Sequence, residues 1–229
     1  MAKFNVNSNA YIITYSVVMV VLVAVLLSVT SLSLQERQGE NILNEKKQQI
    51  VKALGEDPAV ANYADVVAEA IMLDKDGNKI EGKNDEAIFN ALGDLTASFE
   101  AGEYPIFKAA NGCVVIPVYG AGLWGPIWGY IALESDMNTI KGIVMDHSGE
   151  TPGLGAEITT STVQGQFVGK TIFEGVDFVS VSMKKGGATN VHEVDAISGG
   201  TKTCDGVNAM LKSGLEAYLP YINANKSNE

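Results

Sequence analysis

The sequence feature that most constrains this chain is an apolar run near its amino terminus. No side chain from Phe4 to Gln35 is charged, and the stretch from Tyr11 to Leu34 is rich in valine and leucine. A helix of that length spans about 36 Å, whereas the hydrocarbon core of a bilayer is about 30 Å thick. The run therefore predicts a single transmembrane helix in residues 1–35.

A cleaved signal peptide is the alternative interpretation of this run. The apolar region of a signal peptide is usually only about 7–15 residues long and ends in a small-residue cleavage site, so we favour an anchor. Lys3 is the one basic residue in the short tail before the run. A short, weakly positive tail stays inside most easily, which predicts a main domain on the periplasmic side of a bacterial inner membrane.

Charge restricts the partners of the rest of the chain. The formal net charge is -11, and nearly all of the acidic residues follow the apolar run. An acidic surface without a basic stripe repels the phosphates of nucleic acids, so nucleic acid is excluded as an expected partner. Anionic lipid headgroups repel it as well, which predicts a domain that stands off the bilayer.

Cysteine and histidine are too sparse to indicate a metal site. Cys113 and Cys204 are far apart, and His147 and His192 lie in no metal-binding spacing. The two cysteines are either unpaired buried thiols or, in an exported domain, a disulfide. We favour unpaired thiols and expect no metal ligands in this chain.

Residues 36–103 form a predicted juxtamembrane helical region with a small lobe. Apolar residues at helical spacing, an Asp-Gly-Asn turn and a second apolar periodicity carry this prediction. The expected elements are a helix over Glu36–Leu54, a helix over Ala59–Glu69, a hairpin at Asp76–Asn78 and a helical stretch over Glu86–Phe99.

Residues 104–229 form the predicted main domain, in which strand-like runs alternate with glycine turns. The expected strands are Cys113–Tyr119, Ile127–Leu133, Ile140–Met145 and Phe178–Met183, with a helix over Ala156–Lys170 and an amphipathic helix over Cys204–Ile222. The pattern predicts an α+β architecture: one N-terminal transmembrane helix followed by an exported domain with an antiparallel sheet packed by helices.

The most informative segment joins a predicted strand, Val191–Val194, to the last helix through Ser198-Gly199-Gly200-Thr201. Backbone N–H groups of a glycine turn and of the first helical turn form an anion-binding array, and glycine allows a phosphate to approach closely. Thr201 places a hydroxyl at the positive end of the helix dipole. The alternative is that Thr201 or Thr203 only caps the helix, which is the commoner role for threonine there.

Two further segments carry candidate residues. His147–Gly155 follows a strand and contains a proline and three glycines, which favours a rigid loop with an apolar tip at Leu154; the alternative is a structural turn. His147 braces this loop or relays protons, and we favour bracing. Trp124 lies in a glycine-rich hairpin, where a tryptophan is either a core residue, the commoner case, or a stacking platform.

Together these segments resemble FMN-binding domains that a flavin transferase modifies. In that family an aspartate is followed by two residues, Ser or Thr, Gly, usually Ala, and the modified Thr or Ser; here Gly200 replaces the alanine. The resemblance implies that Thr201 carries FMN as a phosphoester, with FAD as donor and AMP as leaving group. The other implied cofactor-binding residues are Ser198, Gly199, Gly200, Lys202 and Thr203, the second signature Glu150, Thr151, Gly153, Leu154 and Gly155, and Trp124.

Two branches of the family share these motifs: the C subunit of the Na⁺-translocating NADH:quinone reductase and the G subunit of the Rnf-type ferredoxin:NAD oxidoreductase. Gly122–Trp124 followed by Gly-Pro-Ile, and the long region before Tyr104, resemble the quinone-reductase branch. This implies an electron-transfer subunit of a Na⁺-pumping NADH:ubiquinone oxidoreductase, without side-chain catalysis of its own. Its implied partners are the other membrane subunits and a flavin transferase with FAD. A membrane-anchored scaffold or ligand-binding domain without redox function is the alternative from another class.

Overall fold

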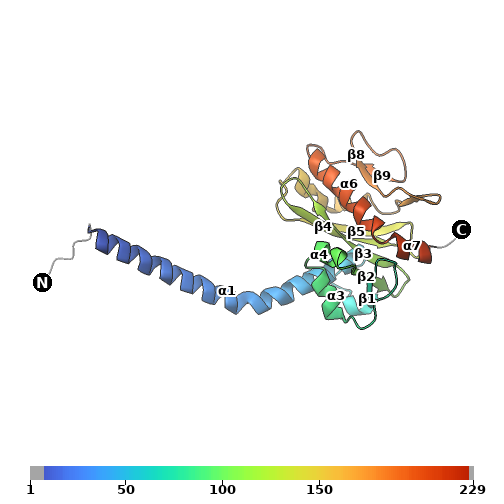
Figure 1. Ribbon diagram of the computed structural model, residues 1–229. Helices are drawn as coiled ribbons and strands as arrows, with labels where there is room; N and C mark the ends of the chain where they lie inside the picture. The colour runs from blue at the N-terminus through green and yellow to red at the C-terminus, as the bar shows by residue number, and fades with distance from the viewer. Residues whose placement is uncertain (1–7, 227–229) are drawn as a thin grey trace. The chain divides into compact units, whose positions relative to one another are not determined.

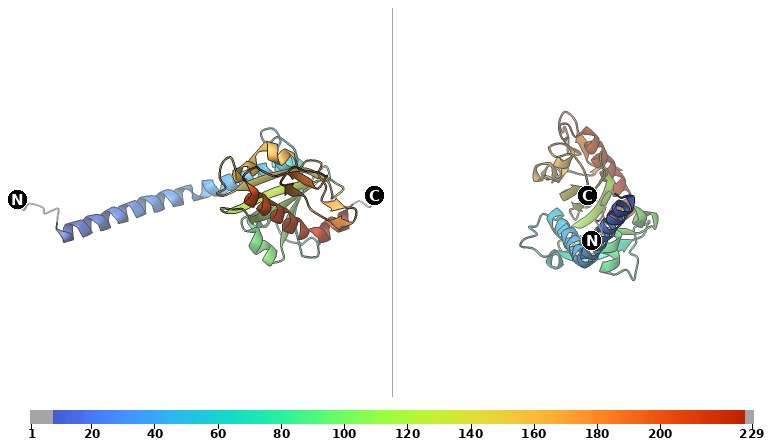
Figure 2. Two further views of the ribbon diagram at one scale, coloured as in Figure 1. Left: turned by 90° about the horizontal axis from the view of Figure 1, so that it is seen from above. Right: turned by 90° about the vertical axis from the view of Figure 1, so that its left-hand side faces the viewer.

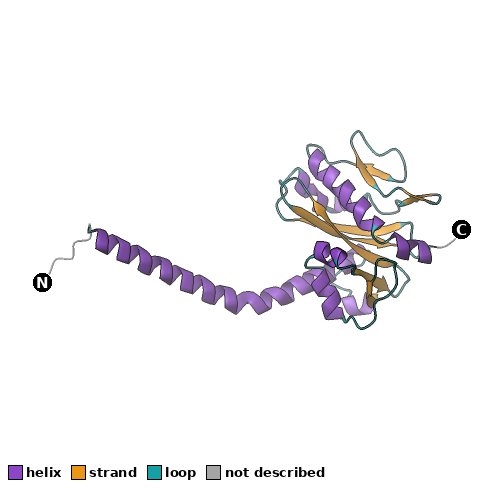
Figure 3. Cartoon of the chain, viewed as in Figure 1, coloured by secondary structure: helices purple, strands orange, loops and turns teal. Residues whose placement is uncertain are grey.

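The computed structural model describes residues 8–226. Lys3, on which the predicted orientation depends, lies outside the described residues. The chain divides into two compact units, Met1–Glu45 and Lys46–Glu229, which we describe separately. The second unit is α+β and confirms the predicted fold class, because its helices cover an antiparallel sheet (Figure 3).

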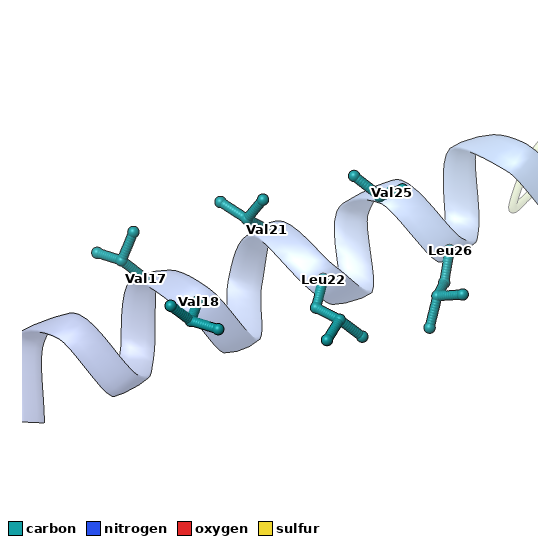
Figure 4. Close-up of a pocket in the computed structure, with 6 residues that line it drawn as sticks. All are labelled: Val17, Val18, Val21, Leu22, Val25 and Leu26. Atoms are coloured by element: carbon teal, nitrogen blue, oxygen red, sulfur yellow. The ribbon is translucent and has the colours of Figure 1, made fainter.

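The first unit consists of the larger part of helix α1, Asn9–Ala53. Within residues 8–226, α1 is the one helix long and apolar enough to cross a membrane, and its most apolar window has a mean hydropathy of 2.8. Six of its exposed apolar side chains are shown in Figure 4: Val17, Val18, Val21, Leu22, Val25 and Leu26. The predicted anchor and juxtamembrane helix are one helical element.

The carboxyl end of α1 belongs to the second unit and ends at a glycine. Gly55 has a φ of 82°, its N–H donates to the carbonyl of Lys52, and the N–H of Glu56 donates to the carbonyl of Val51. This pair of hydrogen bonds is the Schellman arrangement that satisfies the last carbonyls of a helix. The predicted end of the juxtamembrane helix before Gly55 is therefore confirmed.

The second unit is built on a five-stranded antiparallel sheet with the strand order β1-β2-β3-β4-β5 (Figures 1 and 3). Ile131 and Ala132 are neighbours on a central strand and point to opposite faces, yet both are fully buried. Protein therefore covers both faces of the sheet, as the valine- and isoleucine-rich strands require. The strands are β1 (Val67–Leu73), β2 (Tyr104–Ala109), β3 (Val114–Ala121), β4 (Pro126–Leu133) and β5 (Ile140–His147).

Helix α6, Thr201–Glu216, crosses one face of this sheet over β3 (Figures 1 and 2). Glycines allow the close approach: a Cβ on Gly120 would overlap Met210, and a Cβ on Gly206 would overlap the carbonyl of Ala121. Because the amino end of α6 lies by Ala121, it meets the sheet where β3 turns into β4.

Pro117 lies in the part of β3 that pairs with β4 but no longer with β2. It pairs with Tyr130 of β4, but the pairing of β2 with β3 is limited to two residues, Phe107 with Val115 and Lys108 with Val114. Proline has no N–H to donate to a neighbouring strand. It is tolerated here because the edge of β3 that faces away from β4 has no strand partner at this residue.

The remaining elements are short. They are α2 (Tyr63–Val66), α3 (Asp85–Ala91), α4 (Leu95–Glu100), the 3-10 helix η1 (Gly155–Thr159), α5 (Ser161–Gly165), β6 (Phe173–Glu174), β7 (Asp177–Phe178), β8 (Ser182–Lys184), β9 (Glu193–Asp195) and α7 (Leu219–Asn225). The predicted turn at Asp76–Asn78 is confirmed, since Leu73 and Lys79 form an antiparallel bridge across it.

Two of the predicted helices are wrong in extent. Over Ala59–Glu69 only α2 is helical, and β1 begins at Val67 because pairing with β2 overrides local helix propensity. Over Ala156–Lys170 the helix is divided at Thr160, whose backbone is extended and whose hydroxyl caps α5 by accepting from the N–H of Val163.

Three other predicted elements are each divided in two. The strand Phe178–Met183 becomes β7 and β8, because Ser180 between them has a φ of 62°. The helical stretch Glu86–Phe99 becomes α3 and α4, and the final helix Cys204–Ile222 becomes α6 and α7, the latter with Pro220 in its first turn. Proline at that position cannot continue a preceding helix but starts a new one well.

Candidate functional site

The turn that precedes α6 leaves the amino end of the helix without a side-chain cap. Gly200 is the N-cap residue, so Thr201 and Thr203 are the first and third residues of the helix, and no side chain caps it. The first N–H groups of a helix have no intrahelical acceptor. The capping alternative for the two threonines is therefore excluded, and the end of α6 presents N–H groups and the helix dipole together.

The two threonines in this turn have opposite environments. Thr201 is exposed, whereas Thr203 is 1 % exposed and its hydroxyl donates to Oε2 of Glu150 at 2.5 Å. Lys202 is exposed, and its Nζ lies 3.8 Å from a carboxylate oxygen of Asp205. Of the two hydroxyls, only that of Thr201 is open to a modifying enzyme.

Glu150 is the centre of the hydrogen bonds that join the three candidate segments. Its side chain is 4 % exposed. One oxygen accepts from Thr203 and the other from the N–H of Trp124 at 2.9 Å, while the N–H of Glu150 donates to Nδ1 of His147 at 3.1 Å. The resemblance implies that Glu150 binds the cofactor, but its carboxylate faces protein groups below the surface. His147 braces the loop, as we favoured.

The carboxylate of Glu150 is held in its ionised form. Burial alone would raise its pKa, but hydrogen bonds from Thr203 and from the N–H groups of Trp124 and Leu123, with His147 nearby, lower the pKa below its ordinary value. Hydrogen bonds to the charged form favour that form. The three segments are therefore joined around a buried negative charge.

Glycines make room for this arrangement. A Cβ on Gly122 would overlap Oε1 of Glu150, and a Cβ on Gly155 would overlap both Oε2 of Glu150 and the hydroxyl of Thr203. Gly155 is buried, whereas Gly153 is exposed with a φ of 76°. The glycine spacing of the second signature thus reflects two needs, close packing at one residue and a left-handed backbone at the other.

The loop tip packs on the turn before α6. Gly199 has a φ of 75°, and a Cβ there would lie 2.6 Å from a terminal methyl of Leu154. Thr151 is exposed, and its carbonyl accepts from the N–H groups of Leu154 and Ala156, which closes the loop. Ser198 is exposed beside Gly199. The structure therefore brings Ser198–Thr201 and Thr151–Leu154 together at one surface.

Cys204 and Ile197 hold the turn from below, and sequence reasoning gave neither a role. The N–H of Ile197 donates to Sγ of Cys204 at 3.3 Å, and the N–H of Gly200 donates to the carbonyl of Ile197. A Cβ on Gly200 would lie 3.1 Å from two atoms of Ile197. The glycine that replaces the usual alanine thus faces a β-branched side chain. Cys113 and Cys204 are both free and buried, as we favoured.

Apolar side chains are exposed around the open end of α6. Trp124 is 68 % exposed, which excludes the core alternative, and Leu154 is 41 % exposed. Leu123, which sequence reasoning passed over, is also exposed; its place beside Trp124 in a glycine-rich turn is the signal that could have identified it. A large exposed aromatic next to an open helix end is typical of a surface that accepts a flat ligand.

Within residues 8–226, no group of three His, Cys, Asp or Glu side chains is arranged to hold a metal ion. The groups exposed at this surface are the hydroxyl of Thr201, backbone N–H groups, the ammonium group of Lys202 and apolar side chains, one of them aromatic.

Comparison with known proteins agrees with this chemistry. Residues 122–216, which contain Trp124, the His147–Gly155 loop and the turn before α6, match the model of the FMN-binding domain family. The match begins at Gly122, beside Glu150, and ends with α6. The class of protein that this fold and site define is thus a domain that binds FMN.

Relatives of known function narrow the family. The chain is 30 % identical over 207 residues to the C subunit of the Na⁺-translocating NADH-quinone reductase of Vibrio anguillarum, covering 80 % of this chain and 81 % of the relative. It is 41 % identical over 119 residues to the same subunit of Neisseria meningitidis, where the match covers 51 % of this chain and only 46 % of the relative.

Solved structures agree. A crystal structure of the same subunit from Parabacteroides distasonis has a TM-score of 0.76 and 36 % identity, covering 86 % of this chain and 98 % of that one. NqrC from Shewanella oneidensis has a TM-score of 0.64 and 26 % identity, covering 81 % and 99 %. The chain belongs to the NqrC family, the C subunits of the Na⁺-translocating NADH-quinone reductase.

Proposed function

We propose that this chain is the electron-transfer subunit of a Na⁺-pumping NADH:ubiquinone oxidoreductase and carries FMN as a phosphoester on Thr201. The observation that carries the proposal is the exposed hydroxyl of Thr201 at the uncapped amino end of a 16-residue helix. Thr203, two residues away, is buried and bonded to Glu150, so it is a poor acceptor for the same group.

The residues of the open helix end suit a phosphate. The helix dipole stabilises an anion at this end by about 0.3–1 kcal/mol, and Ser198 and Gly199 add hydroxyl and backbone donors, whereas the N–H of Gly200 is already bonded to Ile197. Lys202 supplies a positive charge in a chain whose net charge is -11. Attachment balances as a transfer: the oxygen of Thr201 bonds to the FMN phosphorus of FAD, AMP leaves, and the hydroxyl proton is released.

The apolar side chains beside the helix end suit the ring of a flavin. Trp124 and Leu154 are exposed in two of the segments that the hydrogen bonds of Glu150 join, and Thr151, Gly153 and Gly155 shape the loop that carries Leu154. Covering such side chains removes apolar surface from water, which stabilises the covered state. When bound, FMN supplies reversible uptake of electrons; the chain's residues bind and orient it and exclude water.

The exposed valine and leucine side chains of α1 support a membrane anchor. We place the domain of residues 46–229 on the periplasmic side of a bacterial inner membrane, from the positive charge of Lys3 before the apolar run. The other membrane subunits of the reductase are the proposed electron partners, and a flavin transferase with FAD is the proposed maturation partner. The relatives named above favour the quinone-reductase branch over the Rnf-type branch.

The test is in-gel fluorescence of flavin that remains attached to the denatured chain. The full chain is produced in bacteria with and without a flavin transferase, denatured, separated on a gel and viewed under ultraviolet light. We expect a fluorescent band that depends on the transferase, is lost in Thr201→Ala and is kept in Thr201→Ser, which restores the hydroxyl. Thr203→Ala, the matched control two residues away, should stay fluorescent.

A fluorescent Thr201→Ala band would overturn the assignment of the acceptor. A wild-type chain without flavin fluorescence in the presence of an active transferase would favour the alternative from another class, a membrane-anchored scaffold or ligand-binding domain. NADH-driven quinone reduction that depends on Na⁺, measured on the whole purified complex, then tests the assignment to the reductase.

A further inference from the structure

Glu150 has a position that the family signature alone does not explain. It stands at the start of the loop that the resemblance places near the flavin, yet its side chain is 4 % exposed. Both carboxylate oxygens accept hydrogen bonds from the chain itself, one from the first turn of α6 and one from the turn between β3 and β4. A ligand at the surface would therefore find neither oxygen facing it.

The two bonds join segments that are distant in sequence. Trp124 is 26 residues before Glu150 and Thr203 is 53 residues after it. Trp124 is 68 % exposed, so packing fixes little of its side chain, and the bond from its own N–H links its turn to the carboxylate that Thr203 also binds. Thr203 is fixed from the same carboxylate, two residues from Thr201.

We propose that Glu150 is a positioning residue that sets the place of the Trp124 ring relative to the Thr201 hydroxyl, acting through its hydrogen bonds to Thr203 and to the turn between β3 and β4, and not by touching the flavin. The proposal rests on the proposed attachment of FMN to Thr201. Gly122 and Gly155 support it, because a Cβ on either would overlap the Glu150 oxygens.

The structure offers a matched control in Glu193. This carboxylate is 9 % exposed and accepts from both the N–H and the hydroxyl of Thr189, at 3.0 and 2.7 Å. Like Glu150 it is a nearly buried glutamate bonded to a threonine and a backbone N–H. Its other partner is Lys184, whose Nζ lies 3.4 Å from Oε1 of Glu193, and neither Thr189 nor Lys184 belongs to the three candidate segments. Glu193→Ala therefore measures what the loss of such a carboxylate does without disturbing Trp124.

The experiment uses the full chain with Trp128→Phe, which leaves Trp124 as the single tryptophan, since the sequence has two. Glu150→Ala, Glu150→Gln and Glu193→Ala are compared in two ways. The first is the fluorescence anisotropy and acrylamide quenching of Trp124 before any flavin is added. The second is the rate of covalent flavin incorporation by the transferase and the absorption spectrum of the product, at a temperature where all variants are folded by circular dichroism.

We expect Glu150→Ala to lower the anisotropy of Trp124, to slow flavin incorporation about tenfold and to change the flavin spectrum, because a buried hydrogen bond to a charged group is lost on each side. Glu150→Gln keeps the volume, an oxygen for the N–H of Trp124 and an N–H₂ group for the hydroxyl of Thr203, so it should restore all three. Glu193→Ala should change none.

If Glu150→Ala behaves like Glu193→Ala, or if Glu150→Gln fails to restore the wild-type values, the positioning role is wrong. The anisotropy does not depend on flavin. If the chain accepts no flavin, but Glu150→Ala lowers the anisotropy of Trp124, the attachment proposal is refuted and the positioning of Trp124 by Glu150 is supported. A chain that takes up flavin on Thr201, but whose Trp124 anisotropy is unchanged by Glu150→Ala, would refute the positioning role and leave the attachment proposal standing.

Discussion

The two ends of α6 differ in what they leave open. At the amino end the helix has no side-chain cap, Thr201 is exposed, and exposed apolar side chains surround it. At the carboxyl end Tyr218, 1 % exposed, packs edge-on against Phe99 and Tyr104, and its hydroxyl donates to the carbonyl of Pro105 at 3.0 Å. One end satisfies its polar groups within the fold, and the other leaves them available.

The two ends of α6 therefore serve stability and the proposed flavin site separately. The buried aromatic end removes large apolar areas from water and contributes to the free energy of unfolding. The open end gains little from burial, but its glycines and its buried carboxylate hold a hydroxyl and an aromatic ring at the surface. Substitutions at the two ends should therefore have separable effects, on stability at one end and on flavin at the other.

The largest expected effect on stability comes from the closed end. Tyr218→Ala should lower the free energy of unfolding by about 3–5 kcal/mol, as large-to-small changes of buried aromatics do. Chains that remain folded should still accept flavin at the wild-type extent. Urea unfolding of the full chain in detergent, followed by tryptophan fluorescence, measures the first, and fluorescence of the denatured band measures the second.

Tyr218→Phe is the matched control, because it keeps the ring and removes only the hydroxyl that bonds to Pro105. It should cost about 1 kcal/mol. If folded Tyr218→Ala protein lost flavin while the amino end of α6 was intact, the effects of the two helix ends on stability and on flavin uptake would not be separable.

A smaller effect is expected at Gly199. An alanine there must adopt a φ of 75°, at a cost of about 1–2 kcal/mol, and its Cβ would displace Leu154. Gly169→Ala has nearly the same φ, 77°, and no atom within 4 Å of its Cβ. Both variants should lose similar stability by thermal unfolding, but only Gly199→Ala should change the flavin spectrum. Equal spectra would show that the packing of Leu154 on the turn has no bearing on the site.

The smallest effect concerns pH. The pKa of Glu150 is lower in the folded chain than its ordinary value of 4.5. The stability that its ionised form contributes is therefore complete above about pH 4.5 and is lost as pH falls through the lower folded pKa. The difference in unfolding free energy between wild type and Glu150→Gln should be constant from about pH 7 to 5 and close below that range.

Urea midpoints at a series of pH values measure this difference. Asp136 and Glu193, whose pKa values are also lowered, are present in both proteins and are not among the groups that act on Glu150. Their effects cancel in the difference. The gap between wild type and Tyr218→Phe should stay flat over the same range, because burial raises the pKa of that phenol. A flat gap for Glu150→Gln would mean that its charge adds nothing.

The sequence predicted the fold class, the apolar helix and the central strands, since these depend on local apolar patterns that nothing else in the chain opposes. It did not predict β2 and extended a helix into the start of β1, because a strand such as Val67–Leu73 is decided by its partner strand as well as by its own residues. It also missed the break at Thr160, where a side-chain cap decides the course of the chain.

At the site, the motif predicted which segments lie together but not which of their residues are exposed and which are buried. Thr201 and Thr203 are indistinguishable by residue type, and only the path of the chain shows that one hydroxyl is open and the other faces Glu150. The same holds for Glu150, which a motif places near the ligand and the fold places beneath it. Burial and long-range hydrogen bonds, which a single sequence does not display, decide these roles.

The most direct test is the location of the flavin by peptide mass. Trypsin cleaves after Lys185 and Lys202, so the two threonines fall on different peptides, Thr201 near the end of one and Thr203 at the start of the next. For the full chain matured with a flavin transferase, we predict that the first peptide gains the mass of one FMN less one water, with fragment ions that place it on Thr201. That added mass on the second peptide, or on neither, would contradict the account.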